Sequence, residues 1–219
     1  MTTSSPALLS ADTIRRALGE FQLSPSEQQI LYIQQYMSLL LTWNDKINLT
    51  AIRDPLEILH RHFCECMFAA TAVPVENGRL ADVGSGAGFP GIPLKIIRPE
   101  LQVFLVESNM KKATFLAEVL RNIELPDTKV LVSRYEELGE ELSPLDFVCS
   151  RALGDFAPFL TWAASQTVAA KQVILWIGGR DLEQVQKASS DWDWREPIAV
   201  PNSLRRYLLV GSRKPQPSA

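Results

Sequence analysis

Four glycines within residues 84–91 follow directly on the short apolar run Leu80–Val83. Glycine permits positive φ angles and lets a ligand approach the main chain. A glycine-rich turn between a strand and a helix is where doubly wound α/β folds hold nucleotide-like molecules. Packing alone does not explain so many glycines in one turn. The segment therefore predicts an α/β fold with a cofactor-binding loop.

The residues around the glycines narrow the choice of ligand. Gly88 is followed by Phe89-Pro90, which excludes the Gly-Lys-Ser/Thr ending of a phosphate-binding P-loop. A dinucleotide fingerprint, G-x-G-x-x-G, does occur at residues 86–91, but it starts two residues too far from the strand. Asp82 would repel a pyrophosphate, whereas it suits a ligand with a cationic amino group. Acid-x-Gly-x-Gly-x-Gly is the usual signature for S-adenosylmethionine, and its candidate contacts are Asp82, Gly84, Gly86, Gly88 and Phe89.

Further candidate residues follow the next three strands. Glu107 ends the second strand, where a carboxylate can accept both ribose hydroxyls; the position also suits NAD, or a simple surface carboxylate. Tyr135 and Glu136 follow the third strand, and they would lie either beside the adenine or in an acid-rich helix N-terminus. Arg151 follows the fourth strand, whose carboxyl end faces the ligand crevice in such sheets. It is the candidate catalytic residue, and it is also counted among the cofactor contacts.

The chain divides into a helical N-terminal part and an α/β part. Capping signals at Ser24-Pro25-Ser26-Glu27 and Asp54-Pro55-Leu56-Glu57 predict two cap helices. Short apolar runs then alternate with helix-like segments, which is the pattern of a parallel sheet covered on both faces. The expected strands are Leu80–Val83, Val103–Glu107, Lys129–Ser133, Phe147–Ser150, Val173–Ile177, Pro197–Val200 and Arg206–Val210.

Composition excludes several classes of protein. Of 219 residues, 46% are hydrophobic and 21% charged, values typical of one folded globular unit rather than a disordered or coiled-coil chain. No stretch approaches the roughly 18 uninterrupted apolar residues of a membrane span, and the N-terminus carries no secretion signal. The sequence thus predicts a cytoplasmic protein without a membrane segment.

Cysteine and charge patterns exclude two further features. Cys64, Cys66 and Cys149 are expected to be reduced thiols, because their number is odd and no secretion signal is present. Cys64-x-Cys66 lacks the spacer of a zinc knuckle and the chain has only two histidines, so no metal is expected. The net charge of −3 gives no sign of nucleic-acid binding, which would have to depend on local basic patches.

Missing motifs narrow the chemistry of a methyl transfer. Ser150-Arg151-Ala152-Leu153 does not resemble the Asn/Asp-Pro-Pro-Tyr/Phe motif that serves exocyclic adenine amines. Carbon five of cytosine needs a nucleophilic cysteine, but Cys149 lies within an apolar strand. A ring nitrogen with a free lone pair, such as guanine N7, needs neither nucleophile nor base, only alignment with the methyl group.

The sequence resembles the RsmG (GidB) family of bacterial small-subunit ribosomal RNA guanine-N7 methyltransferases over nearly its whole length. The matching segments are Asn48–Pro55, Arg61-His62, Asp82–Pro93, Glu107-Ser108 with Lys111-Lys112, Ser133–Glu137 and Ser150–Ala152. The resemblance implies a Rossmann-like fold with a seven-stranded, mostly parallel sheet (residues 76–219) and an N-terminal helical cap (residues 1–75). It also implies that S-adenosylmethionine contacts Gly84, Phe89, Tyr135, Glu136 and Arg151.

The implied substrate is a guanine in the decoding-region loop of 16S ribosomal RNA, presented as RNA or as the small ribosomal subunit to a monomeric enzyme. Family members commonly carry Leu-Lys-Gly after the fifth strand, where this chain has Ile177-Gly178-Gly179. Arg180 is a candidate replacement for the missing lysine.

With this family in view, several basic side chains become candidate phosphate contacts. They are Arg53, Arg61 and His62 in the cap, Lys95 and Arg98 after the glycine loop, and Arg180, Arg205 and Arg206 toward the C-terminus. His62 is preferred over His60 by the family match. Arg205 and Arg206 could instead protect an edge strand.

Three other functions stay open. They are methylation of another RNA position or of a small molecule, non-catalytic binding of S-adenosylmethionine or RNA, and NAD-dependent oxidation. The register of the glycines and the presence of Asp82 disfavour the oxidoreductase. Turnover would separate an enzyme from a binding module.

Overall fold

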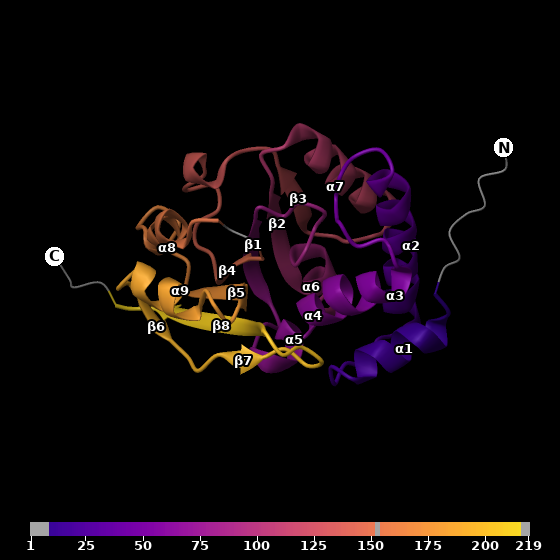
Figure 1. The fold of residues 1–219 in the computed structure, drawn as a ribbon. Helices are drawn as coiled ribbons and strands as arrows, with labels where there is room; N and C mark the ends of the chain where they lie inside the picture. Colours follow the sequence, from indigo (N-terminus) through magenta and orange to yellow (C-terminus); the bar gives the residue numbers. More distant parts are fainter. Residues whose placement is uncertain (1–8, 152–153, 216–219) are drawn as a thin grey trace.

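The computed structural model describes residues 9–151 and 154–215. A central sheet separates two groups of helices (Figure 1). In the described part, eight strands follow the order β3-β2-β1-β4-β5-β8-β6, with β7 paired to β8. They are β1 (Gly78–Val83), β2 (Leu101–Val106), β3 (Thr128–Leu131), β4 (Phe147–Ser150), β5 (Gln172–Gly178), β6 (Trp192–Trp194), β7 (Ile198–Ala199) and β8 (Arg206–Arg213).

The strand order confirms the predicted α/β class. Strands β1 to β5 are parallel, while β8 runs antiparallel to β5 and carries β6 and β7. The order reverses between β1 and β4, and such a switch point opens a crevice at the carboxyl ends of the strands. The sheet has one strand more than the expected seven, because Trp192–Trp194 forms a short strand that the sequence pattern did not indicate.

Both faces of the sheet are covered. On β2, Val103 and Leu105 belong to one apolar cluster, with α6 (Gly91–Ile97) and α7 (Met110–Asn122). The intervening Phe104 belongs to a second cluster, with α8 (Phe156–Ala164) and α9 (Leu182–Ala188). Successive strand residues point to opposite faces, so covering both faces explains why these strands are continuously apolar.

The N-terminal helices join the first of these clusters. They are α1 (Ala11–Gly19), α2 (Glu27–Asn44), α3 (Pro55–Ile58), the π-helical segment Leu59–Cys64, α4 (Glu65–Met67) and α5 (Ala69–Ala72). Asp54 caps α3 with proline at the first helical position, as predicted. The capping box of α2 pairs Ser26 with Gln29, two residues later than the predicted start at Ser24.

Candidate functional site

The glycine loop follows β1 and has an exposed main chain at its first glycine, Gly84. Gly84, Gly86 and Gly88 have φ angles of 70°, 59° and 91°, a region that side chains rarely adopt. No atom lies within 4 Å of the position that a Cβ on Gly84 would take. On Gly88, a Cβ would lie 2.6 Å from the hydroxyl of Tyr36. Gly84 therefore leaves room for a ligand, whereas Gly88 leaves room for the cap.

A pocket of about 280 Å³ opens beside this loop, at the carboxyl ends of β1, β2 and β3. We call it the β1–β3 pocket. It is lined by Val83, Gly84, Val106, Ser108, Ser133, Arg134, Tyr135 and Glu136. The structure thus brings together three predicted cofactor residues, Gly84, Tyr135 and Glu136. It adds Ser108 and Arg134, which the sequence signalled only as neighbours of predicted residues.

Glu107 connects the end of β2 to the glycine loop. The side chain is buried, with 7% of its residue surface exposed. Its Oε2 accepts a hydrogen bond from the Gly86 amide at 2.8 Å, and its Oε1 accepts one from the Asn109 amide at 2.7 Å. A carboxylate has about four acceptor positions, so two remain for a ligand that reaches the loop.

Asp82 lies beneath the loop rather than in the pocket. It is fully buried, and its Oδ2 accepts a hydrogen bond from the Gly91 amide at 2.9 Å. Burial raises the pKa of the carboxyl to about 7. The structure corrects the expectation that Asp82 meets a cationic group of the cofactor, because this carboxyl holds the ends of the glycine loop together.

A chain of contacts runs from the glycine loop through the cap to Arg151. The ring of Phe89 stacks on His62 with centroids 4.7 Å apart. Nδ1 of His62 lies 3.1 Å from the Arg151 guanidinium, and Nε2 lies 2.7 Å from the Thr50 hydroxyl. An arginine can only donate, so Nδ1 accepts. Burial, reinforced by Arg151 and Arg61, lowers the pKa of His62 to about 3, and the ring is therefore neutral.

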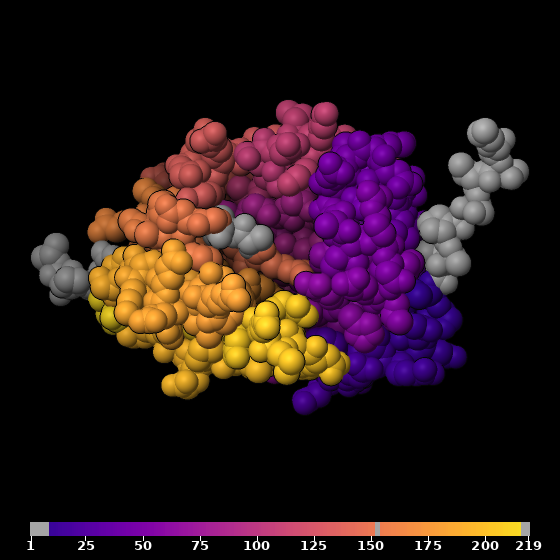
Figure 2. Space-filling view, viewed as in Figure 1, coloured from indigo at the N-terminus to yellow at the C-terminus, as the bar shows by residue number. Residues whose placement is uncertain are grey.

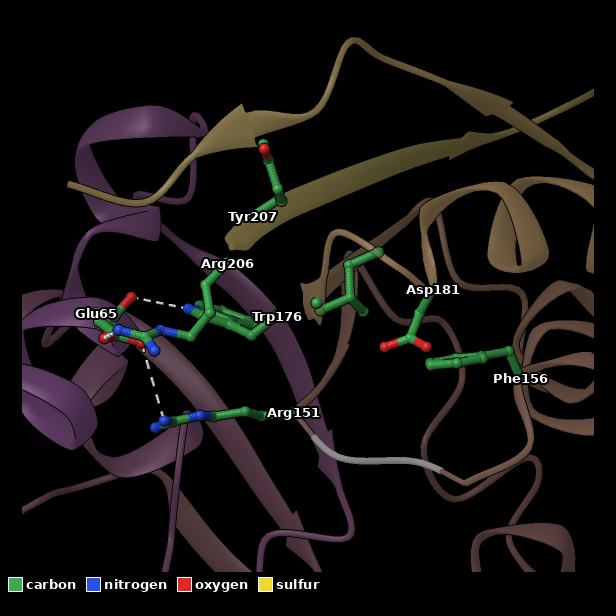
Figure 3. A pocket seen from close by; sticks show the side chains of 9 residues that line it. Glu65, Arg151, Phe156, Trp176, Asp181, Arg206 and Tyr207 are labelled. Carbon is green, nitrogen blue, oxygen red and sulfur yellow. Dashed lines mark hydrogen bonds and ion pairs between the residues drawn. The ribbon is translucent and has the colours of Figure 1, made fainter. Parts of the chain in front are cut away.

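A second pocket, of about 230 Å³, opens at the ends of β4 and β5. We call it the β4–β5 pocket. It is lined by Glu65, Arg151, Phe156, Trp176, Ile177, Gly178, Asp181, Arg206 and Tyr207 (Figure 3). The sequence singled out Arg151 and Arg206 among these, whereas Glu65 and Asp181 were missed. Each is an isolated acid in the sequence, and no motif distinguished it.

Glu65 joins the cap to both arginines of this pocket. Its Oε1 lies 2.6 Å from the Arg206 guanidinium and its Oε2 lies 3.9 Å from that of Arg151. The indole of Trp176 donates to the main-chain oxygen of Glu65 at 2.8 Å. Figure 2 shows that the N-terminal helices (indigo to purple) and the C-terminal segment around β8 (yellow) lie against each other on this face. One further contact between them is a 2.6 Å hydrogen bond from the Asn202 amide to Glu20.

One predicted RNA contact, Lys95, is wrong because its cation is used inside the fold, whereas Arg98 is partly exposed and its contact with RNA stays a prediction. Lys95 is buried, and its ammonium donates to the carbonyl oxygens of Pro99 and Leu101, both at 2.6 Å. Arg98 donates to the carbonyl oxygens of Val75, Ile97 and Ala70. These side chains fix the turn after α6 and the end of the cap.

The other predicted basic residues lie in three different environments. Arg53 and Arg61 pair on the surface of the cap with Asp45 at 3.1 Å and Glu57 at 3.2 Å. Arg180 and Arg205 are exposed around a shallow depression that also includes Leu204, itself 97% exposed. His62 and Arg206 are partly buried in the contacts described above.

Cys64, Cys66 and Cys149 are buried free thiols. Within residues 9–151 and 154–215, no cluster of three or more His, Cys, Asp or Glu side chains has the arrangement of a metal site. No helix in the same ranges is long and apolar enough to span a membrane.

The chain is similar to solved methyltransferases in fold. A structure from Aquifex aeolicus, described as a SAM-dependent methyltransferase, superposes with a TM-score of 0.58 at 15% identity, covering 74% of this chain and 94% of the other. A ribosomal protein L11 methylase from Lactobacillus delbrueckii subsp. bulgaricus superposes with a TM-score of 0.54 at 19% identity, covering 71% and 79%.

Similarity in sequence is closer. A protein from Xanthomonas axonopodis pv. citri named "Ribosomal RNA small subunit methyltransferase G" is 38% identical over 82% of this chain and 84% of its own length. A protein of the same name from Xanthomonas oryzae pv. oryzae is 47% identical over 80% of this chain and 83% of its own. Residues 29–203 match the GidB family, described as rRNA small subunit methyltransferase G. The chain therefore belongs to the rRNA small subunit methyltransferase G (GidB) family.

Proposed function

We propose that this protein transfers a methyl group from S-adenosylmethionine to N7 of a guanine in the decoding-region loop of 16S ribosomal RNA. Membership of the rRNA small subunit methyltransferase G family supports the reaction class and the RNA substrate. The observation that carries the proposal is the pair of pockets at the same ends of the sheet. Arg151 lines one of them and is linked through His62 to Phe89 of the glycine loop.

The residues of the β1–β3 pocket fit S-adenosylmethionine. The bare main chain at Gly84 admits close approach of a ligand. Glu107, next to the pocket residue Ser108, uses about two of its acceptor positions for main-chain amides, and we assign the others to ribose hydroxyls. We assign the adenine to Tyr135 and Glu136, which line the pocket. The carboxylates suit a ligand that carries a positive charge and no phosphate. We therefore assign the cofactor to this pocket.

A bound cofactor would supply a methyl group on a positively charged sulfur. Since N7 of guanine has a free lone pair, its methylation would make the guanine ring cationic and release no proton. The chain's own residues have to align N7 and exclude water. Arg151, held by His62 and Glu65, is placed to orient the base rather than to move a proton. No general base is required.

The proposal includes action as a monomer. We assign residues 1–75 to a cap that closes the site and residues 76–219 to the methyltransferase core. The substrate is the small ribosomal subunit or its RNA, so the proposal places the enzyme in the cytoplasm.

The test is incubation of the purified protein with methyl-labelled S-adenosylmethionine and undermethylated small ribosomal subunits, followed by nucleoside chromatography of the 16S RNA. Label in 7-methylguanosine is the expected result. Label in another nucleoside would replace the proposed position with another one. Binding of the cofactor without transfer to RNA would instead favour a different substrate or a non-catalytic module.

A further inference from the structure

Asp181 opens α9 but does not cap it with its side chain. Its carbonyl oxygen accepts the helical hydrogen bond from the Val185 amide at 2.9 Å, and its own amide donates to Gly178 at 3.0 Å. An aspartate in this position usually accepts a hydrogen bond from the first turn of the helix. Asp181 makes no such bond, and it lines the β4–β5 pocket instead.

Gly178 leaves the space that this carboxylate uses. A Cβ on Gly178 would lie 3.3 Å from Oδ2 of Asp181, which is tighter than ordinary contact. The departure from the family pattern at residues 177–179 therefore coincides with an acid turned into the pocket. A Cβ at residue 178 would require the carboxylate to shift by a few tenths of an ångström.

The two acids of the β4–β5 pocket differ in their partners. Glu65 is occupied by Arg206, and Arg151 lies beside it. Asp181 has no side-chain hydrogen bond or ion pair with the part of the chain that the structure describes. In Figure 3, Asp181 and the ring of Phe156 lie on the opposite side of the pocket from Glu65 and the two arginines. The pocket thus presents the carboxylate of Asp181 on one side and, on the other, a carboxylate that is already paired with arginines.

We infer that Asp181 is the residue that selects guanine, by accepting hydrogen bonds from N1–H and the exocyclic amino group of the target base. This inference rests on the proposed function. Guanine presents these two donors side by side, and a carboxylate offers two acceptors. Adenine has an unprotonated N1 on that edge, which would face the carboxylate unfavourably. RNA bases taken out of a loop are commonly stacked on aromatic rings and read on this edge, and Phe156 provides such a ring.

The same carboxylate assists the reaction electrostatically. The guanine ring becomes positively charged as N7 is methylated, and a fixed negative charge on the far edge of the ring stabilises that charge as it develops. N7 lies on the opposite edge from N1 and the amino group. Hydrogen bonds to Asp181 therefore leave N7 without a partner, and N7 stays available to the methyl donor.

The experiment compares guanosine and inosine at the target position of 16S RNA assembled into small subunits, because inosine lacks only the amino group. For the wild-type enzyme, we expect inosine to lower kcat/KM about tenfold. Asp181→Asn should lower kcat/KM on guanosine by about 10- to 100-fold. For this variant, kcat/KM on inosine should be less than about twofold below that on guanosine. The matched control is Glu183→Gln, an exposed acid on the same helix that pairs with Lys187, which should behave as wild type.

Each outcome separates the two claims. Absence of label at guanine N7 with the wild-type enzyme would refute the proposed function itself. Transfer by the wild type with unchanged kcat/KM for Asp181→Asn, or with an inosine penalty that persists in this variant, would overturn only the role of Asp181. Melting temperatures and the affinity for S-adenosylmethionine should be unchanged in both variants, because the Asp181 side chain supports neither the helix nor the β1–β3 pocket.

Discussion

A single buried carboxyl determines how the glycine loop is held. Asp82 has no exposed surface, yet its Oδ2 accepts the amide of Gly91, and the thiol of Cys149 lies 3.8 Å from Oδ1. A Cβ on Gly91 would lie 2.8 Å from this carboxyl, so glycine is needed there for close approach. One acid thus ties the start of α6 to β1 beneath the loop.

This burial predicts a pH dependence of stability. Desolvation raises the pKa of Asp82 to about 7, against the lowering effects of its hydrogen bonds, whereas the unfolded chain has a value near 4. Between these values the folded state binds a proton that the unfolded state does not. Asp82 therefore lowers the free energy of unfolding as pH rises from about 4 to 7, by a few kcal/mol in all.

Asp82→Asn removes this titration. Urea unfolding from pH 4.5 to 7.5 should show the wild type losing stability with pH relative to the variant, and the other titrating groups cancel in this difference. Two curves that stay parallel across the range would contradict the raised pKa of Asp82.

Between elements, the contact that matters most for the site joins α4 to β8. The side chain of Glu65 is 4% exposed, while its partner Arg206 is 34% exposed. This ion pair connects the cap to the last strand at the β4–β5 pocket. Because Glu65 is the buried partner, removing Arg206 leaves its charge with only the more distant guanidinium of Arg151, at 3.9 Å.

We therefore expect Arg206→Gln to lower the free energy of unfolding by about 2–3 kcal/mol. The neighbouring exposed Arg205 offers a matched control, since Arg205→Gln should change stability by less than about 0.5 kcal/mol. Chemical denaturation of both variants measures the difference. Equal stabilities would show that the pair does not join the cap to the sheet energetically.

Among the helices and strands, those that depend on a local sequence pattern were predicted from the sequence. The apolar runs gave the parallel strands, and Asp54-Pro55 gave the start of α3. The strand Trp192–Trp194 was missed because its alternation of apolar and charged side chains covers only three residues, too few to indicate a strand. Pairing with β8 creates this strand, and pairing partners cannot be identified from the segment alone.

The candidate site shows the same division between local and distant determinants. Gly84, Tyr135 and Glu136 were found because each follows a strand whose end faces the crevice. Lys95 was assigned to RNA wrongly because the carbonyl oxygens of Pro99 and Leu101 accept from its buried ammonium. The sequence identifies the basic residues, but it does not show which carbonyl or carboxylate oxygens lie next to them in the folded protein. Glu65 and Asp181 were missed for the same reason.

Over the whole molecule, the proposed function assigns a small cofactor without phosphates to the β1–β3 pocket and a polyanion to the surface around the β4–β5 pocket. RNA binding releases counterions from phosphates, so we expect RNA affinity to fall steeply with added salt while affinity for S-adenosylmethionine barely changes. Filter binding measures the affinity for RNA and calorimetry the affinity for S-adenosylmethionine. Both are measured from about 50 to about 300 mM salt, a range over which the screening of charges changes strongly. Equal salt sensitivity would contradict this assignment.

The exposed arginines near the β4–β5 pocket should carry part of that salt dependence. Arg205→Gln and Arg180→Gln should each reduce the slope of log affinity against log salt by about one. Arg121→Gln, on α7 at the β3 end of the sheet, should leave the slope unchanged. A slope that is the same in all four proteins would remove these arginines from the RNA surface.

We propose that the β1–β3 pocket holds the methyl donor, and calorimetric titration of Glu107→Gln with S-adenosylmethionine tests this assignment. Replacing the carboxylate that faces Gly86 should raise Kd about 10- to 100-fold, since an amide cannot accept two hydroxyls equally. The exposed Glu124→Gln should keep the wild-type Kd and melting temperature. Glu107→Gln should melt at a lower temperature, because the NH2 group of the new side chain cannot accept from one of the two amides that Glu107 serves, so its Kd is measured at a temperature at which it is fully folded. A wild-type Kd in folded Glu107→Gln would place the cofactor elsewhere and contradict the account.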